Sequence, residues 1–123
     1  MCAYRDHIMN VISLNVNGLR SPIKQSKILT KLKRENIDIA FLQETHLVEA
    51  EHEKLKRQGF KYVFASSNRP RHTRGVVILI SGRVIYEHIS TVKDKEGRFI
   101  MICGKVDGNL FTLYNVYIPP GSD

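Results

Sequence analysis

The stretch Val11-Ile12-Ser13-Leu14-Asn15-Val16-Asn17-Gly18 decides the fold, because apolar and polar residues alternate along it until a glycine ends the pattern. Alternation with a period of two is typical of a β-strand that buries one face. A helix is expected next, with Ser21 as its N-cap and Pro22 as its first residue, and it continues to about Glu35. Residues 38–44 then hold an apolar run without alternation, which predicts a strand covered on both faces.

Strand, helix and buried strand together predict a right-handed βαβ unit with two neighbouring parallel strands. In open α/β sheets, sites form outside the carboxyl ends of such strands. Asn15 and Asn17 end the first strand on one face, and Gln43 and Glu44 end the second. Two amides and a carboxylate are therefore expected at one rim, where polar groups indicate a ligand or a hydrogen-bond network. Alternatively, the two asparagines cap the turn before Gly18 and Glu44 caps the next helix.

The rest of the chain is rich in predicted strands. A surface helix is expected over about residues 48–58, stopped by Gly59, and a polar loop over 66–74. Strands are expected over residues 60–65, 76–80, 84–92, 99–106 and 110–118. The Asp107-Gly108 pair predicts a hairpin between the last two strands.

The composition is that of an ordinary globular protein. With 123 residues, 42% of them hydrophobic and 25% charged, the chain is expected to form one domain, and disordered and fibrous classes are excluded. A net charge of +7 favours polyanionic partners, either nucleic acid or an anionic membrane surface. No apolar run approaches the length of a spanning helix, so no membrane partner is expected.

Residues 1–9 are expected to form a flexible N-terminus, and they contain no apolar segment typical of a secretory signal. The two cysteines, Cys2 and Cys103, are predicted to be reduced thiols. Together these features predict an intracellular protein.

Three motifs, in this order, carry a resemblance to a known family: Leu14–Arg20, Phe41–His46 and Asn115–Pro119. A glycine-led strand at Gly75–Ile80 adds to them. These motifs resemble the N-terminal motifs of the endonuclease/exonuclease/phosphatase superfamily, and most closely the apurinic-like endonuclease domain of non-LTR (LINE-type) retrotransposons. Apurinic/apyrimidinic repair endonucleases and exonuclease III share them less closely. The resemblance covers roughly residues 10 to 120 and implies an α/β fold, the α/β sandwich of the DNase I-like type.

The resemblance implies a catalytic role for Asn15, Glu44 and Tyr117. Glu44 would hold a divalent metal together with Asn17, Asn15 would arrange the metal and the scissile phosphate, and the phenol of Tyr117 would approach that phosphate. The implied cofactor is Mg²⁺, with Mn²⁺ as a possible substitute, because hard cations prefer oxygen ligands. No small-molecule cofactor is expected. His46, two positions after Glu44, is open to interpretation either as a metal ligand or as a neighbouring loop residue.

The resemblance also implies that residues 10–123 correspond to the N-terminal half of the domain, a truncated sandwich. Family members carry an Asp-x-Asn motif, a later Asp and a Ser-Asp-His motif, and none of these follows Tyr117. The isolated chain is therefore expected to be inactive or nearly so, and the inner face of its first sheet is expected to be exposed. Pro120 stands where relatives commonly have Asn, which removes an amide donor near the phosphate or base.

Residues 54–74 contain seven lysines or arginines and no acidic residue. A loop of this charge beside the rim predicts contacts with the DNA backbone, which are mostly independent of sequence. The predicted nucleic-acid-binding residues are Arg20, Arg69, Arg71, His72 and Arg74. The alternative is an ordinary solvated charged loop.

The predicted function is that of a Mg²⁺-dependent, retrotransposon-derived DNA endonuclease that cleaves phosphodiester bonds, with the nucleus as the location that the resemblance implies. The alternative is a non-catalytic nucleic-acid-binding or pseudogene-like remnant. A phosphatase of the same superfamily, acting on lipid or nucleotide phosphoesters, is a third hypothesis, which the basic loop and the motif at Asn15–Arg20 disfavour.

Overall fold

The computed structural model describes residues 8–69, 71–118 and 121. Most of the predicted flexible segment 1–9 therefore lies outside the described residues, as do Cys2 and Pro120. The expectations for these positions stay predictions.

Four strands form the first sheet, in the spatial order β1-β2-β4-β3. They are β1 (Val11–Asn15), β2 (Ile39–Gln43), β3 (Tyr62–Ser66) and β4 (Val76–Ile80). β1 and β2 run parallel, with Val11 opposite Ile39 and Asn15 opposite Gln43, whereas β4 runs antiparallel to both β2 and β3. The helix α1 (Pro22–Arg34) connects the parallel pair, so the βαβ unit predicted from the sequence is confirmed.

The start of α1 follows the predicted capping pattern. Ser21 is the N-cap, its hydroxyl accepts a hydrogen bond from the Lys24 amide, and Pro22 is the first helical residue. Leu29 and Leu32 are buried and pack in the core cluster between this helix and the first sheet. Within the described part of the chain, no helix has the length and apolar character needed to cross a membrane.

The helix predicted over residues 48–58 is divided. It consists of the short helix α2 (Glu49–Glu53) and the 3-10 helix η1 (Lys54–Gln58), and it ends at Gly59, whose φ of 100° suits glycine. His52 and Leu55 are buried, so the segment is a packed part of the fold rather than a fully solvated surface element.

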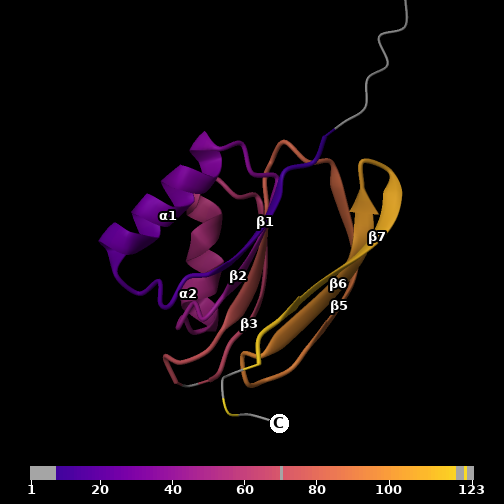
Figure 1. Cartoon of the computed structure of the whole chain (residues 1–123). Helices are drawn as coiled ribbons and strands as arrows, with labels where there is room; N and C mark the ends of the chain where they lie inside the picture. The colour runs from indigo at the N-terminus through magenta and orange to yellow at the C-terminus, as the bar shows by residue number, and fades with distance from the viewer. Residues whose placement is uncertain (1–7, 70, 119–120, 122–123) are drawn as a thin grey trace, which may run out of the picture.

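Three antiparallel strands form the second sheet, in the order β5-β6-β7. They are β5 (Tyr86–Lys93), β6 (Phe99–Val106) and β7 (Asn109–Val116). The predicted Asp107-Gly108 turn joins β6 to β7, with Val106 opposite Asn109. Figure 1 shows α1 and α2 on one side of the first sheet and the second sheet on the other side.

The prediction that the inner face of the first sheet is exposed is wrong. Ile78 and Ile80 of β4 are fully buried, and they pack in one cluster with Ile100 and Ile102 of β6. The inner face is covered because the strands that follow β4 fold back over it as the second sheet (Figure 1). The α/β sandwich is confirmed, and its exposed apolar residues include Val92, Tyr114 and Val116 of the second sheet.

Candidate active site

The carboxyl ends of β1 and β2 bring together the polar residues that the βαβ unit predicts there. Asn15 lies opposite Gln43 at the last pair of the two strands, and Glu44 follows directly. The Asn15 side chain donates a hydrogen bond from Nδ2 to Glu44 Oε2 over 2.7 Å. An amide and a carboxylate that are 29 residues apart in the sequence therefore share one rim.

Asn17 does not continue the strand. Its φ of 49° is left-handed, so the alternation that would place it on the face of Asn15 ends before it. Its main-chain amide donates to Asn15 Oδ1 over 3.0 Å. The Asn15 side chain thus caps the turn before Gly18 and also hydrogen-bonds Glu44, so it is both a turn cap and part of the hydrogen-bond network at the rim. Asn17 reaches the site through its main chain, and among the described residues no hydrogen bond joins its side chain to Glu44.

The turn after β2 is pinned by main-chain hydrogen bonds to the end of the loop that precedes β4. The amides of Thr45 and His46 donate to the carbonyls of Gly75 and Arg74, over 3.1 and 2.7 Å. Gly75 has a φ of 98°, and a Cβ atom there would collide with the Thr45 hydroxyl. The glycine that leads β4 is therefore required by the close approach of the turn that carries Glu44.

A buried hydrogen-bond network supports this turn from below. His52 Nε2 lies 2.7 Å from Thr45 Oγ1, and its Nδ1 lies 2.8 Å from Ser67 Oγ. Burial lowers the pKa of His52 to about 4, so the imidazole is neutral at physiological pH. The network connects α2, the turn after β2 and the end of β3. Sequence reasoning missed it, because a lone histidine in a short polar helix carries no periodic signal.

Asn115 joins the two sheets directly beneath the rim. Its side chain is buried and donates from Nδ2 to the carbonyls of Leu42 and Val77, over 3.0 and 2.8 Å. Its Oδ1 accepts a hydrogen bond of 2.8 Å from Gln43 Nε2. Asn115 therefore fixes the position of β7 against β2 and β4, two residues before Tyr117. The motif Asn115–Pro119 contains this residue, but nothing in the sequence assigned it a role.

Tyr117 reaches the carboxylate of Glu44 from the second sheet. The hydrogen bond from Asn15, followed by those from Tyr117 and the nearby His46, lowers the pKa of Glu44. The hydrogen bond to Glu44 in turn raises the pKa of Tyr117. At neutral pH the carboxylate is therefore charged and the phenol is protonated. His46 Nε2 lies 3.7 Å from Glu44 Oε1, so His46 is a neighbour of the carboxylate.

The predicted DNA-binding residues divide into two groups. Three side chains of the basic loop are paired with glutamates: Arg69 with Glu49 at 3.1 Å, His72 with Glu51 at 3.1 Å and Arg74 with Glu96 at 3.8 Å. Arg20 and Arg71 are exposed. The loop is adjacent to the rim through the hydrogen bond between Arg74 and His46, but much of its charge is already compensated by α2 and by Glu96.

The donor set fits a hydrated hard cation. Within the described residues there is no group of three or more acidic, histidine or cysteine side chains that could hold a metal. Zinc sites require such a group, whereas Mg²⁺ is commonly held by one or two carboxylates with water and substrate phosphate. Glu44 supplies one charged carboxylate, and Asn15 keeps it oriented.

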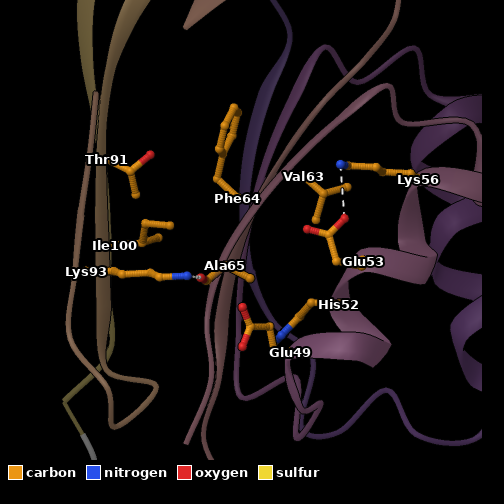
Figure 2. A pocket seen from close by; sticks show the side chains of 10 residues that line it. All are labelled: Glu49, His52, Glu53, Lys56, Val63, Phe64, Ala65, Thr91, Lys93 and Ile100. Carbon is orange, nitrogen blue, oxygen red and sulfur yellow. Dashed lines mark hydrogen bonds and ion pairs between the residues drawn. The ribbon is translucent and has the colours of Figure 1, made fainter. Parts of the chain in front are cut away.

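A separate groove shares His52 with the network that supports the Glu44 turn. Figure 2 shows it between α2, β3 and the strands of the second sheet, and its volume is about 440 Å³. Its charged side chains are engaged within the protein, since Lys56 pairs with Glu53 at 3.0 Å and Lys93 donates to the Ala65 carbonyl over 3.2 Å. None of Asn15, Glu44 and Tyr117 lines it, so the groove is not part of the candidate active site.

Comparison with known proteins places this geometry in context. A model of the Endonuclease/Exonuclease/phosphatase family matches residues 12–121. The chain is 29% identical over 111 residues to the Transposon TX1 uncharacterized 149 kDa protein of Xenopus laevis, a match that covers 90% of this chain and 8% of the relative.

Among solved structures, an AP endonuclease from Archaeoglobus fulgidus superposes with a TM-score of 0.69 at 25% identity, over 93% of this chain and 42% of that chain. A structure of D. rerio TDP2 complexed with single strand DNA product superposes with a TM-score of 0.60 at 20% identity, over 86% of this chain and 44% of that chain. The chain thus spans less than half the length of these solved proteins.

Proposed function

The chain belongs to the endonuclease/exonuclease/phosphatase family, and on that premise we propose that its candidate active site serves the metal-dependent hydrolysis of phosphodiester bonds in DNA. The single observation that carries the proposal is the convergence of Asn15 and Tyr117 onto the carboxylate of Glu44, at the ends of three strands. The likeness to an AP endonuclease and to a TDP2 structure that holds a DNA product supports DNA as the substrate.

Each of the three residues has a role that follows from its contacts. Glu44, ionised at neutral pH, would hold Mg²⁺ or Mn²⁺, and Asn15 keeps the carboxylate facing the rim. Tyr117 stays protonated, so its hydroxyl could donate to a phosphoryl oxygen if it gave up its hydrogen bond to Glu44. When bound, the metal would neutralise the charge that develops on the phosphoryl group.

The same site explains why we propose low activity for the isolated chain. Hydrolysis requires a group that accepts a proton from the attacking water. The Glu44 carboxylate has a lowered pKa and is already engaged, and the Tyr117 phenol is a donor, so neither is a suitable base. We therefore expect the 123-residue chain to bind metal and DNA more readily than it cuts.

The alternative, a nucleic-acid-binding protein without catalysis, is favoured by one observation. The net charge of +7 provides sequence-independent attraction to the DNA backbone without any need for a metal. The two proposals differ in whether Glu44 binds a divalent cation.

Mn²⁺ binding and plasmid nicking, measured on the same samples, test the proposal. We expect Glu44→Gln to weaken Mn²⁺ binding at least about tenfold, because it removes the charged ligand at constant shape. The matched control is Glu87→Gln on the exposed side of β5, which should bind Mn²⁺ as the wild type does.

Any nicking of supercoiled plasmid should disappear with EDTA and in Glu44→Gln. Equal Mn²⁺ binding by the two variants, or nicking that survives EDTA, would contradict the proposal. Salt-sensitive retention of plasmid without any Mn²⁺ binding would favour the non-catalytic alternative.

A further inference from the structure

Arg98 has a buried guanidinium nitrogen, Nε, that finds no acceptor among the described residues. Its Nε atom is the one buried side-chain nitrogen or oxygen without a hydrogen-bond partner among the residues that the structure describes. An unpaired buried donor is unfavourable, and such groups are rare in folded proteins. The residue as a whole is only half-buried.

The position of Arg98 is set by the pairing of β6 with β7. The Tyr117 amide donates to the Arg98 carbonyl over 2.8 Å, which extends the ladder by one residue beyond the pair of Phe99 and Val116. Residues directly opposite each other in an antiparallel ladder place their side chains on the same face. Arg98 and Tyr117 are therefore neighbours on the inner face of the second sheet, the face from which Tyr117 reaches Glu44.

The main chain of Arg98 is held on both sides. Its amide donates to both carboxylate oxygens of Asp94, over 3.2 and 3.3 Å, and its carbonyl accepts from Tyr117. The Asp94 carboxylate also accepts a 2.6 Å hydrogen bond from Ser66, so it serves the turn rather than the guanidinium. These main-chain contacts fix the point from which the Arg98 side chain starts, opposite Tyr117.

The basic loop beside the rim provides a contrast. Arg69 and Arg74 are each paired with a glutamate, so they must give up a partner before they can contact DNA. Arg98 has no such partner in the described part of the chain. A guanidinium presents a rigid fork of donors that matches the oxygens of a phosphate group.

We propose that Arg98 is a phosphate-binding residue of the candidate active site, where it holds a backbone phosphate of the DNA strand beside Tyr117. This inference rests on the proposed function, because it requires DNA to lie across the rim. It adds a contact that lies outside the predicted basic loop and beside the phenol.

The test is the salt dependence of duplex binding, measured by fluorescence anisotropy with a short labelled DNA in EDTA. For duplex DNA, each phosphate contact contributes about 0.9 to the slope of log K against log salt. We expect Arg98→Ala to reduce the slope by about one and to weaken binding about tenfold at low salt. Arg98→Lys should keep the slope, because it retains the charge, and bind more weakly because it loses the fork.

The matched control is Arg57→Ala, which removes an exposed arginine of η1 near the opposite end of the first sheet. Its slope and affinity should equal those of the wild type. If Arg98→Ala fails to melt cooperatively, the neutral variant Arg98→Gln of similar length takes its place.

Three outcomes are distinguishable. A smaller slope in the neutral Arg98 variant alone supports the inference. A slope equal to that of Arg57→Ala overturns the inference and leaves the proposed function standing. A wild-type chain without salt-dependent binding to the duplex overturns the proposed function and the inference together.

Discussion

The inner faces of the two sheets pack against each other, but only the first sheet has helices over its outer face. Every residue of β4 in the first sheet is buried, because helices cover one face and the second sheet covers the other. In β5 of the second sheet only Tyr86 is buried. The first sheet supplies Glu44 on a turn with several supports, and the second sheet supplies Tyr117 and Arg98. The candidate site thus lies between the first sheet, whose strand β4 is fully buried, and the second sheet, whose strand β5 is mostly exposed.

The largest expected effect on stability is the removal of a central side chain from the first sheet. Ile78 lies in the middle of β4, fully buried, and Ile78→Ala should lower the free energy of unfolding by about 4 kcal/mol through lost burial and a residual cavity. Val92→Ala, at a half-exposed position of β5, should lower it by less than about 1 kcal/mol. Urea denaturation of the two variants and the wild type measures both values.

If Ile78→Ala does not fold, Ile78→Val is the milder substitute, with an expected loss of about 1 kcal/mol. Similar losses at Ile78 and Val92 would show that the two sheets are equally packed and that the contrast is wrong.

The buried His52 of α2 predicts that the stability of the fold depends on pH. The pKa of His52 falls from 6.5 to about 4 on folding, so between these values the unfolded chain binds a proton that the folded chain does not. The stability that the fold gains from burying a neutral His52 is therefore fully present above about pH 6.5 and is lost as the pH falls towards 4. At about 1.4 kcal/mol for each pH unit, the loss amounts to roughly 3 kcal/mol.

Denaturation at pH 7 and pH 4.5, repeated with His52→Gln, separates this contribution from that of the carboxylates. The variant should be less stable at pH 7 but lose less on acidification. The matched control is His88→Gln in β5, where partial burial lowers the histidine pKa less than the full burial of His52 does. The pH profile of this variant should stay close to that of the wild type. An unchanged acid dependence in His52→Gln would rule out the buried neutral imidazole.

The polar link between the sheets should give the smallest of the three effects. Asn115→Ala removes the side-chain donor to the carbonyls of Leu42 and Val77 and one of the acceptors of Gln43 Nε2, for a loss of about 2 kcal/mol in unfolding free energy. Asn109→Ala, at the exposed start of β7, should change stability by less than about 0.5 kcal/mol. Equal values would mean that the sheets are held by apolar packing alone.

Local sequence patterns were sufficient to predict several of the secondary-structure elements. The strand before Gly18, the Ser21-Pro22 start of α1 and the Asp107-Gly108 hairpin were each predicted and are confirmed, but the face of that strand expected to be buried leaves Leu14 exposed. The same patterns could not show that the second sheet covers the first, since periodicity tells which face is apolar and not what packs against it. They also could not show that Asn17 leaves the strand, because its left-handed φ depends on the turn around it.

The sequence by itself determined the βαβ unit, the family motifs and the rim where Asn15 and Glu44 meet, because spacing along a strand translates directly into position at its end. Only the tertiary structure decided that Asn115 joins the two sheets, that His52 is buried beneath the Glu44 turn and that Arg98 lies opposite Tyr117 with an Nε that has no partner among the described residues. The physical reason is that these contacts join residues from different sheets or distant loops, whose relative placement follows from packing and not from any local pattern.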